Sequence, residues 1–195
     1  MKQISKHIAT GIIFSSILSG CAGVLVGGAA TGVAVVHDRR TTGTVLDDQS
    51  IELKASKAFY SDKMLSKNSH INVTSYNGIV LLSGEVINTE ARHSAHQHVQ
   101  NLDKVRRIHN QLTIAAPSSL LSRSSDTLIT AKAKTHLLSV KGIKDFDLTR
   151  IKIITENGVV YLMGLVTRQE ADAATESVRQ IDGVQRIERM FEYID

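Results

Sequence analysis

Apolar and polar positions follow the same order twice along this chain. Residues 71–84 align with residues 151–164, and each copy places two runs rich in β-branched residues around an Asn-Gly pair. Such runs predict strands, and Asn-Gly between them predicts a tight hairpin, because both residues tolerate positive φ. The sequence therefore predicts one hairpin at Asn77-Gly78 and another at Asn157-Gly158.

A helical pattern precedes and follows each hairpin. Apolar residues recur at helical spacing before the hairpins at Ile51, Ala55, Ala58 and Phe59, and at Ile129, Ala133, Leu137 and Val140. They recur after the hairpins at Ala91, Ala95, Val99 and Leu102, and at Ala171, Ala174, Val178 and Ile181. Thr167 and Glu170 form a capping box at the start of the later helix of the second copy, and the first copy offers Asn88 or Thr89 instead.

Each copy ends in one further predicted strand, over residues 105–114 and residues 184–193. The resulting order is αββαβ, which predicts the α+β class: two tandem domains, each a three-stranded mixed sheet with both helices on one face. A repeat of this length suits duplication of a small domain and is too long for a solenoid unit.

The N-terminus has the pattern of an exported lipoprotein. Lys2 and Lys6 precede an apolar run that is too short to span a bilayer, and the run ends in Leu18-Ser19-Gly20-Cys21. This resembles a bacterial lipobox, in which the Cys receives a diacylglycerol and becomes the first residue. The alternative is an ordinary secretory signal or an inner-membrane signal anchor in which Cys21 is incidental.

Residues 22–36 are apolar and glycine-rich, and two of their glycine pairs have the G-x-x-x-G spacing of helices in lipid. They are too few to span a bilayer, and a flexible tether remains open beside a helix. Ala22 after the Cys favours the outer membrane over the inner membrane. The predicted segments are a signal peptide (1–20), a lipidated tether (21–47), domain 1 (48–114), a linker containing the only proline (115–124) and domain 2 (125–195).

Composition excludes several functions. The net charge of +4 falls to +2 once Lys2 and Lys6 leave with the signal peptide, and an exported chain is separated from DNA, so we expect no nucleic acid. A single Cys allows no intrachain disulfide, and motifs of hydrolases, nucleotide-binding enzymes and metalloproteases are absent from the sequence.

His93 and His96 have a spacing that could bind a metal, but a solvated helix face is the simpler explanation. We therefore expect no enzyme activity, no metal and no cofactor beyond the acyl lipid on Cys21.

These residues resemble a known family. The Asn-Gly hairpin, the glycines Gly84 and Gly164, and the pairs Glu90-Ala91 and Glu170-Ala171 are similar to those of BON domains, as are Asp103–Val105 and Asp182–Val184. With a lipobox and two copies, the chain resembles the dual-BON outer-membrane lipoproteins of the DolP type. The resemblance implies a non-enzymatic periplasmic protein that binds anionic phospholipid and supports outer-membrane integrity near division sites. It also leads us to expect an aromatic residue where this chain has Leu128.

The first helix of domain 2 is the candidate lipid-binding element. Residues 127–144 contain lysines but no Asp or Glu, and apolar residues such as Leu128 lie off the core stripe. Lysines beside exposed apolar residues suit an anionic membrane surface. We assign phospholipid contact to Leu128, Lys132, Lys134, Leu137, Leu138 and Lys141. The first helix of domain 1 is also apolar off its core stripe, but its acidic residues dilute its lysines, and one such surface could pack against the other domain.

Two hypotheses follow. In the first, a monomer anchored through Cys21 faces the periplasm from the outer membrane and contacts anionic phospholipid through domain 2, with outer-membrane assembly or division proteins as further partners. In the second, the chain is a periplasmic adaptor or chaperone that holds an envelope assembly through sheet edges or the first helix of domain 1.

Overall fold

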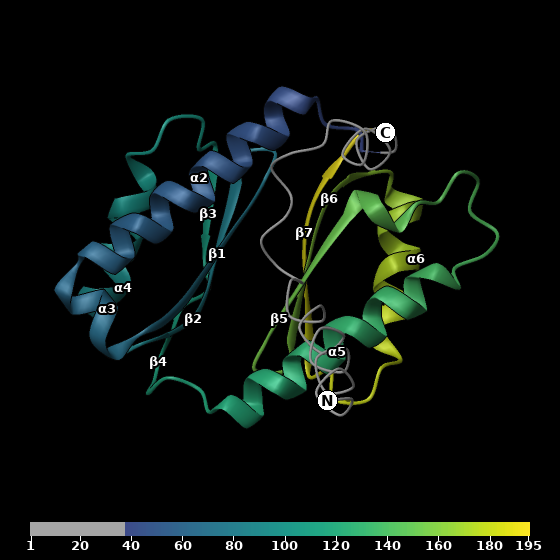
Figure 1. The fold of residues 1–195 in the computed structure, drawn as a ribbon. Helices are drawn as coiled ribbons and strands as arrows, with labels where there is room; N and C mark the ends of the chain where they lie inside the picture. Colours follow the sequence, from purple (N-terminus) through teal and green to yellow (C-terminus); the bar gives the residue numbers. More distant parts are fainter. Residues whose placement is uncertain (1–37) are drawn as a thin grey trace, which may run out of the picture. The chain divides into compact units, whose positions relative to one another are not determined.

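A computed structural model describes residues 38–195 of the chain (Figure 1). The predicted signal peptide, Cys21 and most of the predicted tether lie outside the described residues. Domain 1 consists of α2 (Thr42–Ser61), α3 (Lys63–Asn68), β1 (His70–Tyr76), β2 (Ile79–Val86), α4 (Thr89–Gln100), β3 (Arg107–Asn110) and β4 (Thr113–Ile114). Domain 2 consists of α5 (Leu120–Leu138), a 3-10 turn (Leu148–Arg150), β5 (Ile151–Glu156), β6 (Val159–Val166), α6 (Arg168–Arg179) and β7 (Arg186–Tyr193).

Both predicted hairpins are confirmed. β1 pairs antiparallel with β2, and β5 pairs antiparallel with β6. Asn77 and Gly78 have φ of 52° and 72°, and Asn157 and Gly158 have φ of 50° and 74°. Positive φ at both central residues is the geometry that matches the twist of the flanking strands. The last strand of each domain then adds in parallel to the second hairpin strand, which makes both sheets mixed.

The helix caps also follow the sequence. Thr167 and Glu170 form the predicted capping box at the start of α6. In domain 1 the cap is Asn88, whose side chain accepts a hydrogen bond from the backbone N–H of Ala91 at 2.8 Å. This resolves the choice between Asn88 and Thr89.

Domain 1 departs from the predicted elements in three places. Its last strand is interrupted between β3 and β4, because the side chain of Leu112 turns into the core and is 2% exposed. The short helix α3 was not predicted, and Asp62 caps it by accepting from the N–H of Met64. α2 begins at Thr42 and so takes in residues assigned to the tether.

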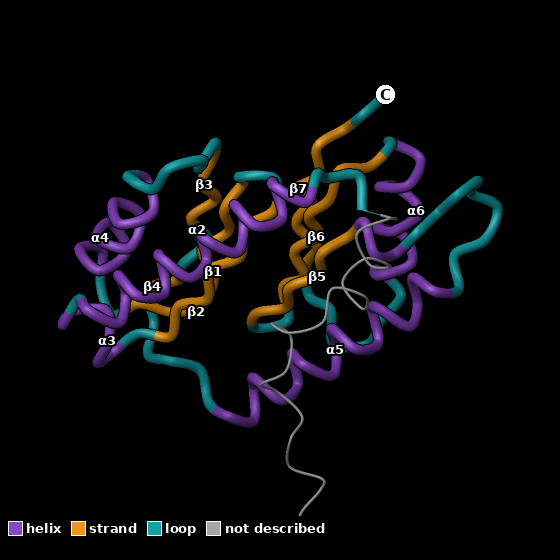
Figure 2. Tube along the Cα trace, turned by 45° about the horizontal axis from the view of Figure 1, so that its top comes forward, coloured by secondary structure: helices purple, strands orange, loops and turns teal. Residues whose placement is uncertain are grey.

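Each sheet carries its two longer helices on one face, which confirms the predicted α+β architecture (Figures 1 and 2). Alternate residues of the central strand, Val80 and Leu82 in β2 and Val160 and Leu162 in β6, pack beneath these helices and are fully buried. Alternation is expected, because successive side chains of a strand point to opposite faces.

The opposite faces of the two sheets are buried as well. Their apolar side chains form a third core, here called the intersheet core, which contains Tyr76, Ile79, Leu81, Tyr161, Met163 and Met190. Residues of both domains contribute to it. Each sheet is therefore covered by helices on one side and by the other domain on the second side.

Candidate membrane-binding surface

The sequence of α5 explains why the helix forms and which face it leaves exposed. Ser119 caps its start by accepting a hydrogen bond from the N–H of Ser122 at 3.2 Å. The buried residues of the helix are Asp126, Ile129, Ala133 and Leu137, which repeat at helical spacing. The opposite face is left to solvent.

Five of the six residues assigned to phospholipid contact lie at the surface. Leu128 is 63% exposed and Leu138 is 71% exposed. Lys132, Lys134 and Lys141 are exposed too. The assignment of Leu137 was wrong: its side chain is 1% exposed and packs in the core of domain 2, so it has no surface to offer a lipid.

Two further apolar residues were missed by the sequence reasoning. Leu120 and Leu121, in the first turn of α5, are 79% and 81% exposed. Leu121 lies seven residues before Leu128, so the two share a helix face two turns apart. The sequence places both residues in the predicted linker (115–124), which contains the only proline. Ser119 immediately before an apolar pair is the helix-start signal that would have found them.

The lysines flank this apolar face on both sides. Lys132 and Lys134 are separated by about 160° around the helix axis, with Leu128 between them. Lys134 lines a hollow that it shares with Glu52 and Tyr76 of domain 1. Lys132 lies on the other flank, away from that carboxylate.

α2 carries a comparable apolar stripe in domain 1. Leu46, Leu53 and Tyr60 recur every seven residues and are 60%, 72% and 84% exposed. The charges of the two helices differ, because α2 has three acidic residues and two lysines, whereas the only acidic residue of α5 is the buried Asp126. Exposed apolar residues alone therefore do not favour one helix over the other as a membrane-binding element. The charge of the two helices favours α5.

Metal-ligating side chains converge elsewhere. Within residues 38–195, one group of three, His70, Glu85 and Glu156, brings its ligand atoms within 4.8 Å of one another. The pair singled out by sequence, His93 and His96, belongs to no such group in the part of the chain that the structure describes. No helix among the described residues has the length and hydropathy to cross a membrane.

Comparison with known proteins agrees with the two-domain fold. The chain is 34% identical to "Outer membrane lipoprotein DolP" of Haemophilus influenzae over 190 residues, 97% of each chain. It is 33% identical to the "21 kDa hemolysin" of Actinobacillus pleuropneumoniae, over 80% of this chain and 79% of that protein. It is 26% identical to "Osmotically-inducible protein Y" of Escherichia coli, over 95% of this chain and 94% of that protein. The BON domain family matches residues 47–116 and again residues 125–195, and the chain thus belongs to the BON-domain family as a protein with two copies.

Proposed function

We propose that this chain is a non-enzymatic lipoprotein of the outer membrane, anchored through the lipid on Cys21 and facing the periplasm. The lipobox that ends in Cys21 and the similarity to an outer membrane lipoprotein over nearly the whole chain support this. The lipid would hold the two BON domains close to the membrane surface.

Within that arrangement, α5 of domain 2 binds anionic phospholipid. The observation that carries this is the exposure of Leu128 and Leu138 on a helix whose lysines are not neutralised by exposed acidic residues. A lysine near an anionic surface contributes about 1 kcal/mol, and each buried apolar side chain adds to that. Because the lipid already confines the protein to the membrane, even this weak contact decides where on the membrane it resides.

Vesicle co-sedimentation of a soluble chain beginning at residue 35 tests the proposal. That start keeps all of α2 and the compact unit of residues 35–195. We expect binding to anionic vesicles, weaker binding to neutral ones, and a marked loss with Lys132→Glu plus Lys134→Glu. The matched control is Lys54→Glu plus Lys57→Glu on α2. Equal binding to neutral and anionic vesicles, or equal loss in both variants, overturns the assignment to α5.

The anchor and its location have their own test. Mass spectrometry of the mature N-terminus, combined with membrane fractionation, should find an acylated Cys21 in the outer membrane. An unmodified Cys21 removes the anchor from the proposal. We further infer, from the family resemblance, a role in outer-membrane integrity near division sites. Fluorescence imaging of the tagged full chain should then show enrichment at septa that is lost with the α5 lysine variant.

A second candidate function is that of a protein adaptor. The observation that favours it is the α2 stripe of Leu46, Leu53 and Tyr60, whose mixed charges do not favour an anionic surface. Crosslinking in cells separates the two functions. One dominant protein partner that survives the α5 lysine changes and is lost with Leu53→Lys supports the adaptor.

A further inference from the structure

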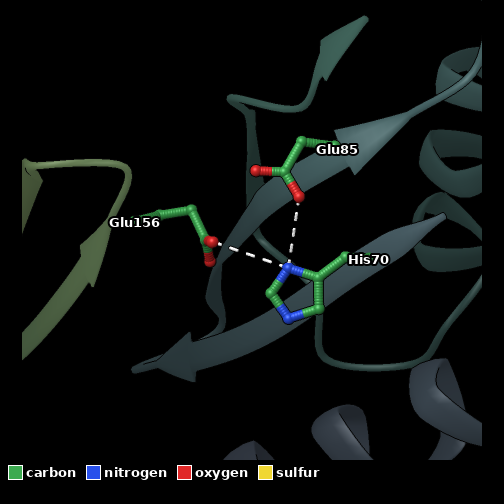
Figure 3. Close-up of side chains that lie close together, drawn as sticks. All are labelled: His70, Glu85 and Glu156. Atoms are coloured by element: carbon green, nitrogen blue, oxygen red, sulfur yellow. Dashed lines mark ion pairs between the residues drawn. The ribbon is translucent and has the colours of Figure 1, made fainter. Parts of the chain in front are cut away.

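A histidine and two glutamates meet where the two domains join (Figure 3). His70 begins β1 and Glu85 lies directly opposite it in β2, so the hairpin register of domain 1 brings them together. Glu156 ends β5 of domain 2. These three residues are called the His70 triad below. Neither domain could form it alone.

The imidazole points between the two carboxylates. Nδ1 of His70 lies 3.3 Å from Oε2 of Glu85 and 3.5 Å from Oε1 of Glu156. This Nδ1 is buried and has no hydrogen-bond partner. Two ligands of a tetrahedral zinc ion are about 3.3 Å apart, given metal–ligand bonds of about 2.0–2.2 Å. The two separations from Nδ1 match that spacing and exceed the usual length of a hydrogen bond, and the three ligand atoms as a group lie within 4.8 Å of one another.

Burial makes the arrangement costly without a positive charge. The side chains of Glu85 and Glu156 are 3% and 6% exposed. Two ionised carboxylates held together out of water require a compensating cation or proton. Burial raises the pKa of Glu156 despite the hydrogen bond from Asn72. For Glu85, burial is outweighed by hydrogen bonds from the N–H of Ser118 and from Asn157, which lower its pKa.

Neighbouring groups fix both carboxylates in place. Nδ2 of Asn72 donates to Oε2 of Glu156 at 2.7 Å. Glu85 accepts from the backbone N–H of Ser118 at 3.0 Å and from Nδ2 of Asn157. Outer hydrogen bonds of this kind orient the ligands of protein metal sites.

We propose that the His70 triad binds a divalent transition-metal ion, of which zinc is the best fit, and that the ion fastens domain 2 to domain 1. One imidazole nitrogen and two carboxylate oxygens form a ligand set that suits zinc and its neighbours, whereas magnesium and calcium prefer oxygen alone. Three protein ligands leave a position for water.

The ion would act on the relative position of the domains. Glu85 and Glu156 come from different sheets, and Ser118 belongs to the linker between the domains. Metal bound to all three ligands therefore opposes separation of the two sheets and movement of the linker. This inference does not depend on the proposed lipid contact of α5, which lies on the exposed face of that helix.

The test uses the chain from residue 35 with zinc chloride as the probe. We expect one zinc ion per chain by calorimetry, a higher unfolding temperature with zinc, and its reversal by a chelator. X-ray absorption should report a site of nitrogen and oxygen ligands with a single imidazole. His70→Gln and Glu156→Gln should each weaken zinc binding by more than the roughly 10- to 100-fold that follows loss of an outer hydrogen bond.

The matched control is His93→Gln plus His96→Gln, which removes the surface pair on α4 that could bind zinc adventitiously. This variant should bind zinc as the parent does. Circular dichroism without zinc confirms that each variant is folded, and Glu156→Gln keeps the size of the side chain in case His70→Gln is unstable. No stoichiometric zinc binding, or binding lost in the α4 variant and kept in His70→Gln, overturns the proposal. Stability that responds to pH and not to zinc also overturns it.

Discussion

The carboxylate of Asp126 accepts a hydrogen bond from the backbone N–H of Gly158 at 2.9 Å, which joins α5 to the hairpin turn of domain 2. Its other oxygen accepts from the N–H of Asn157, also at 2.9 Å. Asp126 is 6% exposed. The turn N–H groups therefore have charged partners in place of water, and the first helix is fixed to the sheet by a polar contact as well as by its apolar face.

Domain 1 repeats the arrangement. Asp48 accepts from the N–H groups of Asn77 and Gly78 at 2.7 and 2.8 Å. It also binds the hydroxyl of Ser75 and the guanidinium of Arg40. Both copies thus use one buried aspartate on the first helix to hold the Asn-Gly turn.

Asp126→Ala should lower the free energy of unfolding by about 1–3 kcal/mol, because the buried N–H of Gly158 and the partly buried N–H of Asn157 lose their acceptor. Chemical denaturation of the chain from residue 35 measures this. The control is Asp103→Ala at an exposed position, expected to stay within about 0.5 kcal/mol of the parent. Equal effects of the two changes would show that the contact with the turn contributes nothing.

These aspartates show where sequence reasoning stopped. The hairpins and the capping box were predictable, because each depends on residues a few positions apart. Asp126 and Gly158 are brought together only by tertiary packing. The signal was nonetheless in the repeat, since Asp48 and Asp126 hold equivalent positions before the two hairpins. The His70 triad had no such signal, because it draws on both domains and has no equivalent in a single copy.

Gly84→Ala should destabilise domain 1 strongly. Gly84 has φ of 108°, and a Cβ there would collide with the backbone carbonyl of His70. Strain and collision together should cost more than about 2 kcal/mol. Gly142 also has positive φ, 81°, but a Cβ there would meet nothing within 4 Å. Gly142→Ala therefore measures the cost of positive φ without a collision. An equal decrease in unfolding temperature in both variants would contradict the close approach of Gly84 to His70.

Acid should weaken the junction between α3 and α4. The hydrogen bonds from His98 and Ser94 lower the pKa of Asp62 from 3.8 to about 2. A carboxyl with a depressed pKa contributes stability that is fully present above its unfolded value and is lost as pH falls through its folded value. The free energy of unfolding should therefore decrease between pH 3.8 and about 2.

Asp62→Asn provides the comparison, since Asn remains a good helix cap but does not titrate. Urea unfolding measured at several pH values across that range gives the free energy of unfolding as a function of pH. This free energy should depend less steeply on pH for Asp62→Asn than for the parent. Identical slopes would assign the acid sensitivity to other carboxyls.

The surface of α5 was predicted less fully than its core stripe. Periodicity placed Ile129 and Ala133 correctly, since both are buried. It also placed Leu137 in that stripe, which made its assignment to lipid contact inconsistent with the pattern. Leu120 and Leu121 were missed because the start of a helix depends on its cap as well as on periodicity.

Leu128→Trp should tighten binding to anionic vesicles. Leu128 is 63% exposed at the centre of the proposed lipid-binding face, and aromatic side chains prefer the membrane interface. We expect the free energy of vesicle binding to become more favourable by about 1 kcal/mol, which lowers the dissociation constant roughly fivefold. Leu53→Trp on α2, a helix whose acidic residues offset its two lysines, is the control. Co-sedimentation with vesicles measures the parent and both variants, since the parent contains no Trp, and an equal gain at Leu53 would remove the preference for domain 2.

The intersheet core should couple the stabilities of the two domains. Leu81 of domain 1 and Met163 of domain 2 are fully buried members of it, and each change to Ala should cost about 2–5 kcal/mol. Because the two side chains belong to one core, the double variant should depart from additivity by about 0.5–3 kcal/mol. Val80 supplies the control, since it neighbours Leu81 but packs under the helices of domain 1. Val80→Ala combined with Met163→Ala should be additive within about 0.5 kcal/mol. If both pairs were additive, Leu81 and Met163 would not be coupled across the intersheet core, and the prediction would be wrong.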